Sequence, residues 1–173
     1  MQTASAIDSY LAQTNTDNLC LTFRLSDQDY GIAIGKVQEI REWTKVTPLP
    51  SSPSYIRGML NLRGAIVPVI DLRRRFGLDA LEQDSATVII VVNVGSRLAG
   101  LLVDTVSDVI SVDPGQRRPL PEFEGHANRR FIESLVQIDD QLMLLLNVDQ
   151  LVAPEDLAPA TQTVGAAKQR GAL

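Results

Sequence analysis

The chain has 173 residues, 45% of them hydrophobic, which is enough to bury the core of one ordinary domain or of two small lobes that share a core. Its net charge of −5 and its pI of about 4.8 argue against non-specific binding to nucleic acid or to an anionic membrane. It has no apolar run long enough for a membrane span, no signal-peptide pattern and one cysteine, Cys20, so we expect a reducing, cytoplasmic location without an internal disulfide.

In chain order, the pattern is mostly that of short β-strands. Residues 1–17 are small and polar and are expected to form a flexible tail or a loose helix. Pro68 predicts an edge position or a bulge for its strand. The Leu-rich run at 142–148 fits either a strand or a buried helix. Other apolar, β-prone runs predict strands at 19–25, 31–34, 65–72 and 87–94.

Short helices and polar connections are expected between and after these strands. A proline at the start and a glycine at the end predict a helix at 53–58, and a second short helix is expected at 149–153. A polar linker covers 77–85, and residues 155–173 repeat the tail-like composition of the N-terminus. Short strands broken by Gly, Pro and Asn indicate small barrels rather than βαβ units.

The chain also repeats itself. When it is shifted by 69 residues, "YGIAIGKVQEI" (30–40) falls on "AGLLVDTVSDV" (99–109). Further matches follow as the offset drifts: "PLP" at 48–50 and 119–121, "YIRG" at 55–58 with "FIES" at 131–134, and "VIDL" at 69–72 with "NVDQL" at 147–151. Glycine, acidic and proline positions match in order, so we infer two copies of one small β unit.

Little in the sequence indicates catalysis, metal binding or a cofactor. The one histidine, His126, lies in the polar stretch "EGHANRR", where a solvated loop is favoured over a Ser-His-Asp site. Cys20 is interpreted as a small core residue. With 21 acidic residues, a pair of carboxylates acting as general acid and base stays an open alternative. The sequence has no phosphate-binding glycine loop.

The basic and aromatic residues do not form a nucleic-acid pattern. Aromatic residues make up 5% of the chain, too few for a row of stacking platforms. For the basic clusters 73–75, 117–118 and 129–130 a solvated surface is the default interpretation. Arg117 and Arg118 also fit a specific partner contact, because they lead into "PLPEF".

Three stretches, "YGIAIGKVQEI", "SYIRGMLNLRGAIVPVIDLR" and "LAGLLVDTVSDVISV", resemble the CheW family, the coupling proteins of bacterial chemotaxis, and the resemblance covers about residues 18–153. It implies an all-β fold of two five-stranded SH3-like β-barrel lobes that share a hydrophobic core, with short helices and a C-terminal helical segment. The lobes are expected at about 18–76 and 86–152, with room for strand exchange between them, and flexible tails at 1–17 and 155–173. Ser134 stands where the family usually has glycine, so either that turn is rebuilt or the glycine is not left-handed.

The resemblance implies a non-catalytic adaptor. Its expected partners are the cytoplasmic hairpin tip of a chemoreceptor (a methyl-accepting protein) and the regulatory domain of the chemotaxis histidine kinase, in membrane receptor arrays reached through those partners. No cofactor, nucleic acid or direct membrane insertion is implied. Alternatives are a coupling protein of a non-flagellar system such as type IV pilus motility, a scaffold with one partner, and an enzyme with carboxylate chemistry.

Candidate binding residues follow from the repeat and from the resemblance. The repeat pairs Val37 and Ile40 with Val106 and Val109, which would line two walls of a groove, although each alone also fits an ordinary core. Gly64 would hold Arg63 outward to bind a receptor carboxylate; the alternatives are an internal pair with Glu39 and simple exposure to solvent. The receptor-binding candidates are Val37, Glu39, Ile40, Gly58, Arg63, Gly100, Val106 and Val109. The kinase-binding candidates, at exposed barrel ends, are Ile56, Arg118 and Phe123.

Overall fold

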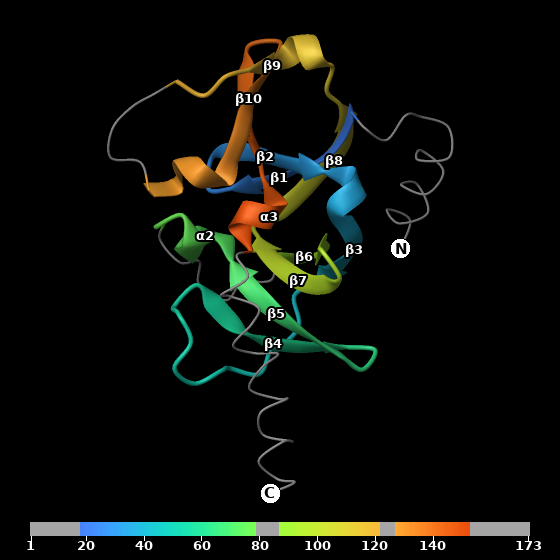
Figure 1. The fold of residues 1–173 in the computed structure, drawn as a ribbon, viewed down its shortest axis with the longest axis vertical. Helices are drawn as coiled ribbons and strands as arrows, with labels where there is room; N and C mark the ends of the chain where they lie inside the picture. The colour runs from blue at the N-terminus through green and yellow to red at the C-terminus, as the bar shows by residue number, and fades with distance from the viewer. Residues whose placement is uncertain (1–17, 79–86, 122–126, 153–173) are drawn as a thin grey trace, which may run out of the picture.

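The computed structural model describes residues 18–78, 87–121 and 127–152 (Figure 1). The first copy of the repeat forms β1 (Leu19–Leu25), β2 (Gln28–Ala33), η2 (Ile34–Lys36), β3 (Val37–Glu42), β4 (Ile56–Leu62), β5 (Ala65–Asp71) and α2 (Leu72–Arg75). The second copy forms β6 (Val88–Val94), β7 (Arg97–Val103), β8 (Thr105–Ser111), η3 (Pro114–Gln116), β9 (Arg117–Arg118), η4 (Ala127–Phe131), β10 (Ile132–Ile138), β11 (Gln141–Leu146) and α3 (Val148–Leu151).

The strands form two sheets that mix the two copies. The six-stranded sheet has the order β8-β1-β2-β11-β10-β9, and the five-stranded sheet has the order β3-β6-β7-β5-β4. Neighbouring strands are antiparallel except for the parallel pairs β2–β11 and β5–β7. Thus β1 and β2 of the first copy join β8–β11, while β6 and β7 of the second copy join β3–β5 (Figure 1). Each sheet forms one lobe, and the lobes are called here the six-stranded lobe and the five-stranded lobe.

The order of elements confirms the repeat. β1–β3 correspond to β6–β8, and β4, β5 and α2 correspond to β10, β11 and α3. Even the helix caps match: Asp71 accepts hydrogen bonds from the backbone N–H groups of Arg73 and Arg74, and Asn147 accepts one from that of Gln150. The "VIDL" and "NVDQL" segments therefore perform the same local task in each copy.

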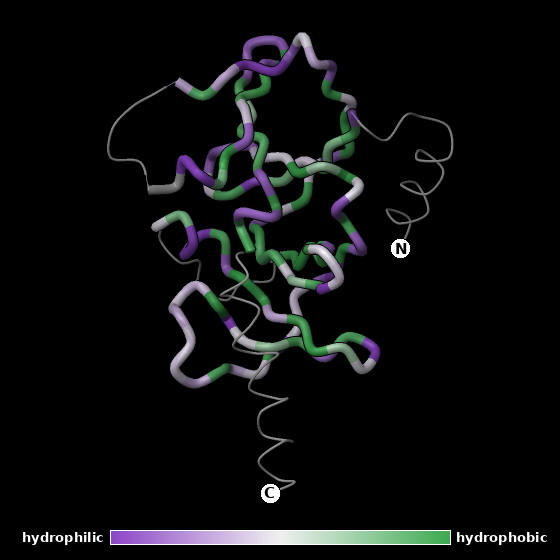
Figure 2. Tube along the Cα trace, viewed as in Figure 1, coloured by the Kyte–Doolittle hydropathy of each residue, from purple (hydrophilic) through white to green (hydrophobic). Residues whose placement is uncertain are grey.

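A single apolar cluster joins the two lobes. It contains Leu21 and Phe23 of the six-stranded sheet and Ile90 and Leu101 of the five-stranded sheet, all essentially without solvent exposure. Each lobe adds a smaller cluster of its own. Cys20 is buried in the cluster of the six-stranded lobe, which confirms its interpretation as a core residue. Figure 2 shows hydrophobic stretches along the central strands and hydrophilic residues at the outer turns.

Several local predictions need correction. No helix forms at 53–58: the backbone N–H of Ile56 donates to the carbonyl of Pro53 at 3.0 Å, and Ile56 begins β4. The 142–148 run is largely strand, because β11 covers Gln141–Leu146 and α3 begins at Val148. The edge alternative for Pro68 is wrong, because β5 lies between β7 and β4. Pro68 precedes Val69, where pairing with β7 begins, so its missing N–H costs no bond in the paired part of that ladder.

In the basic cluster 73–75 the solvated-surface interpretation holds for Arg74, which is exposed, and is wrong for Arg73 and Arg75, which are partly buried. Arg73 is only 13% exposed because it pairs with Asp104. The guanidinium carbon of Arg75 lies 4.1 Å from the ring centre of Tyr55 and 4.8 Å from that of Phe131. These contacts anchor α2 to both lobes.

Candidate functional site

The turn between β4 and β5 holds Arg63 outward. Arg63 (φ 50°) and Gly64 (φ 88°) both have positive φ, as a two-residue hairpin turn requires, and the side-chain oxygen of Asn61 accepts a hydrogen bond from the Gly64 N–H at 3.0 Å. The Arg63 side chain is 73% exposed, and its Nη2 donates to Oε1 of Glu39 on β3. The structure thus contains the internal pair, yet it leaves most of the guanidinium open to solvent.

The four apolar receptor candidates lie on edge strands of different sheets. Val37 and Ile40 are on β3, at the edge of the five-stranded sheet, and Val106 and Val109 are on β8, at the edge of the six-stranded sheet. All four are partly buried and pack against the same shared cluster. In Figure 1 both strands lie on the right-hand side of the molecule. Half-burial means that each side chain combines core packing with some accessible surface.

The two candidate glycines are explained by contacts within the chain. A Cβ on Gly58, which has φ +153°, would lie 2.4 Å from the carbonyl oxygen of Thr47. A Cβ on Gly100 would lie 3.0 Å from a methyl carbon of Ile89. Both glycines are buried, so the close backbone approach that each permits is internal.

Ser134 occupies the β10 position that corresponds to Gly58 in β4. Each strand has a register shift there, between Ile56 and Gly58 in β4 and between Ile132 and Ser134 in β10. Unlike Gly58, Ser134 is not among the described residues with positive φ. Its buried Oγ has no hydrogen-bond partner within the described parts of the chain. The second lobe therefore builds this bulge without a left-handed residue.

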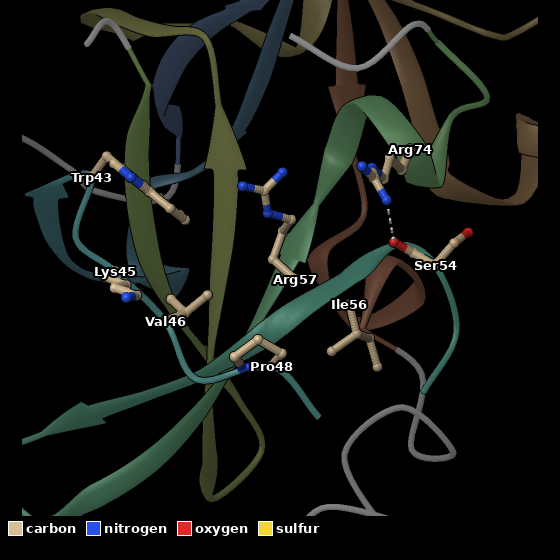
Figure 3. A pocket seen from close by; sticks show the side chains of 8 residues that line it. All are labelled: Trp43, Lys45, Val46, Pro48, Ser54, Ile56, Arg57 and Arg74. Atoms are coloured by element: carbon tan, nitrogen blue, oxygen red, sulfur yellow. Dashed lines mark hydrogen bonds between the residues drawn. The ribbon is translucent and has the colours of Figure 1, made fainter. Parts of the chain in front are cut away.

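The kinase candidates divide between the lobes. Ile56 was expected at an exposed barrel end, but this is wrong: it is 8% exposed because it begins β4, and it forms part of the lining of a surface hollow of the five-stranded lobe (Figure 3). Arg118 is exposed on β9 of the six-stranded lobe, where its Nη1 donates to the Gly115 carbonyl at 3.3 Å. Phe123, like His126, lies outside the described residues.

The sequence analysis did not identify two exposed apolar residues, Ile66 and Leu142. Ile66 and Leu142 are each 53% exposed and occupy equivalent positions, near the start of β5 and of β11. Their cross-strand neighbours, Asn61 and Gln137, are polar. Extending the repeat upstream of "VIDL", with Asp71 aligned on Asn147, would have paired these two residues, but the largely apolar runs that contain them have no alternating pattern that predicts an exposed face.

The described residues do not form a metal site, and no described helix has the length and apolar character needed to cross a membrane. Burial raises the pKa of the Cys20 thiol above its usual value; the positive charge of Arg117 opposes this shift, and the negative charge of Glu133 adds to it. A thiol with a raised pKa stays protonated and unreactive at neutral pH.

Comparison with known proteins agrees with the fold. The family model for the CheW-like domain matches residues 19–155. The chemotaxis protein CheW of Klebsiella aerogenes is 40% identical over 150 residues, which cover 87% of this chain and 90% of that protein. The chemotaxis protein CheW of Rhizobium meliloti is 38% identical over 143 residues, covering 83% and 92%. The crystal structure of the scaffolding protein TtCheW from Thermoanaerobacter tengcongensis superposes with a TM-score of 0.74 at 31% identity, covering 81% of this chain and 95% of that one. The chain therefore belongs to the family of CheW-like domains.

Proposed function

We propose that this protein is a non-catalytic adaptor that couples the cytoplasmic hairpin tip of a chemoreceptor to the regulatory domain of the chemotaxis histidine kinase. It works in the cytoplasm and reaches membrane receptor arrays through its partners. The observation that carries the proposal is the match to chemotaxis and scaffolding proteins along almost the whole length of the chain and of its relatives. Such an adaptor needs two separate binding surfaces.

The receptor surface combines apolar and charged groups. Val37, Ile40, Val106 and Val109 supply half-buried apolar side chains at the margin of the shared core, which suits the apolar face of a helix. Arg63 supplies an exposed guanidinium, which contacts β3 through its ion pair with Glu39. A receptor carboxylate that replaces Glu39 as the partner of Arg63 would gain a charge-assisted hydrogen bond. Gly58 and Gly100 support this surface from inside the five-stranded lobe.

The kinase surface lies at the outer ends of the barrels. Arg118 and Phe123 belong to it, and exposed Ile66 and Leu142 are further apolar residues at hairpin ends. Large apolar side chains left exposed on a β-structure are candidates for partner contacts. We expect both interfaces to be small and partly polar, as in transient signalling complexes, so each should have moderate affinity. In an array, many such contacts together would give tighter overall binding.

Co-sedimentation tests the proposal. Receptor-containing membranes should carry the purified kinase into the pellet only when this chain is present. Arg63→Glu should remove the chain from the membrane pellet while it still binds the soluble kinase, and Phe123→Ala should do the reverse. Arg97→Gln, on the exposed start of β7, serves as a charge-changing control.

Two outcomes would reject this assignment. If wild-type chain binds neither receptor membranes nor kinase, the adaptor role is wrong. If it binds only the receptors and kinase of a non-flagellar system, such as type IV pilus motility, the chain couples that system instead.

A further inference from the structure

The surface hollow of the five-stranded lobe is lined by cations and apolar groups. It has a volume of about 420 Å³ and lies between the segment that follows β3 and the start of β4. Its lining residues are Trp43, Lys45, Val46, Pro48, Ser54, Ile56, Arg57 and Arg74 (Figure 3). Three of these carry positive charge and none carries negative charge, although the whole chain has a net charge of −5. The hollow is therefore a local exception to the acidic character of the protein.

The guanidinium groups of Arg57 and Arg74 share one carboxylate. Asp71 Oδ2 lies 3.9 Å from Nη1 of Arg57 and 3.6 Å from Nε of Arg74, both beyond ordinary hydrogen-bond distance. The other oxygen of Asp71 caps α2 by accepting backbone N–H groups. Arg74 also donates to the Ser54 carbonyl at 3.3 Å. One carboxylate that also caps a helix thus faces two cations, and both arginines line the hollow.

Four apolar side chains also line the hollow: Trp43, Val46, Pro48 and Ile56. Val46 and Ile56 are each 8% exposed and form its buried part, while Pro48 is exposed. Trp43 forms one side, and the guanidinium carbon of Arg57 lies 5.3 Å from its ring centre. Figure 3 shows the Arg57 guanidinium between Trp43 and Arg74. A ligand that fills this space would meet apolar contacts and two arginines together.

We propose that this hollow binds a small organic carboxylate, with its apolar body against Val46, Pro48 and Ile56 and its carboxylate on Arg57 and Arg74. Apolar pockets with a few converging polar groups are the usual form of small-molecule sites. Arginine is the side chain best suited to bind a carboxylate, because its planar group presents two parallel N–H donors. Lys45, exposed at the rim, adds a third positive charge that attracts an anion.

The single tryptophan of the chain makes the site directly observable. The indole N–H of Trp43 gives one resonance in a ¹H–¹⁵N spectrum, because no other tryptophan is present. We would titrate the full chain with hexanoate, with hexanamide, which has the same apolar body without charge, and with acetate, which has the charge without the body. Hexanoate should shift the resonance saturably, and both other compounds should bind about tenfold more weakly, as the loss of a charged hydrogen bond or of apolar contact predicts.

Substitutions separate the site from general electrostatic attraction. Arg57→Gln should weaken hexanoate binding about tenfold. Lys45→Gln, which leaves Asp71 with both of its arginines, should weaken binding about two- to threefold, as expected for one exposed charge. Arg97→Gln, with the same change in net charge at the start of β7, should bind as wild type does.

The proposal fails if hexanamide binds as tightly as hexanoate, because the arginines would then have no role. It also fails if Arg57→Gln and Lys45→Gln both bind like wild type. Should Arg57→Gln unfold, Lys45→Gln and the three-ligand comparison decide alone. None of these measurements involves receptor or kinase, so their outcome is independent of the adaptor role.

Discussion

Arg73 of α2 donates two hydrogen bonds to Asp104, from Nε to Oδ1 at 2.7 Å and from Nη2 to Oδ2 at 2.5 Å. Asp104 lies where the chain leaves β7 of the five-stranded sheet for β8 of the six-stranded sheet, and its Oδ2 also accepts the N–H of Ser26 at 2.8 Å. The corresponding crossover, from β2 to β3, is held by Lys36 and Asp149 of α3 with the charges reversed. That pair is 39% and 54% exposed, against 13% and 15% for Arg73 and Asp104.

The two crossover pairs should therefore differ in their effect on stability. Asp104→Asn removes the negative charge from a largely buried ion pair that has two hydrogen bonds, so we expect a loss of about 2–4 kcal/mol in the free energy of unfolding. Lys36→Ala removes an exposed pair and should cost less than about 1 kcal/mol. Urea titrations followed by circular dichroism measure both. Equal losses would show that burial does not distinguish the two crossovers.

Gly58 should tolerate no side chain. A Cβ there would press on the backbone of Thr47, which cannot rotate away, and alanine would also have to adopt φ +153°. Overpacking and backbone strain together predict a loss of about 2–5 kcal/mol for Gly58→Ala. Gly35→Ala is the matched control, since its Cβ would meet nothing within 4 Å, and should change stability by less than about 0.5 kcal/mol. Thermal unfolding of both variants checks the contrast, and a Gly58→Ala variant as stable as wild type would contradict it.

Ser134 lies at the β10 bulge that is equivalent to the one at Gly58, but here we expect alanine to be tolerated. Its Oγ is buried without a partner among the described residues, so the folded state has lost the hydration of that hydroxyl without compensation. Ser134→Ala should therefore leave stability unchanged or raise it by up to about 1 kcal/mol. Urea titrations measure the change. A loss of more than about 1 kcal/mol would mean that the hydroxyl is satisfied in solution.

The repeat could be detected in the sequence, but which strands of the two copies pair with one another could not. The match of "VIDL" to "NVDQL" identified two equivalent segments, and in the structure each leads into a short helix, capped by Asp71 in one copy and by Asn147 in the other. The predicted helix at 53–58 is wrong because Ile56 of β4 pairs with Ile70 of β5 and the Tyr55 carbonyl accepts the N–H of Asp71, contacts with residues outside the predicted segment. A sequence shift also cannot show that β1 and β2 pair with strands of the second copy, which depends on how both copies bury one core.

The candidate site, like the fold, was predicted only in part from the sequence. The Arg-Gly pair of "NLRG" predicted an outward Arg63, and Glu39 was named as its alternative partner; the structure contains that pair. The hollow lined by Trp43, Arg57 and Arg74 was missed, because its side chains come from three separate elements. Only the folded chain brings them together.

Cys20 should make stability depend on pH in the alkaline range. Burial raises the pKa of its thiol above 9.0 in the folded state, so the unfolded chain ionises first as pH rises. The unfolding free energy should then be independent of this group below about pH 9 and should fall as pH rises through the folded-state pKa. Tyr30, whose pKa burial also raises from 10.0, adds to the fall at higher pH. Urea titrations of wild type and Cys20→Ala from pH 7 upward check this, and a decline above about pH 9 that the substitution leaves unchanged would contradict it.

Arg63 and Glu39 allow internal pairing to be separated from partner binding. The pair is exposed at the arginine end, so Arg63→Glu and Glu39→Arg should each cost less than about 1 kcal/mol of stability, and the double variant should recover that loss. If the guanidinium binds a receptor carboxylate, Arg63→Glu should weaken receptor binding at least about tenfold, and adding Glu39→Arg should not restore it, because the charge then stands on β3 rather than on the turn. Arg63→Lys should recover only part of the affinity, since an ammonium lacks the paired donors. Unfolding curves and pull-downs with receptor membranes give the two readouts, and full binding by the Arg63→Glu single variant would show that Arg63 serves only its internal pair.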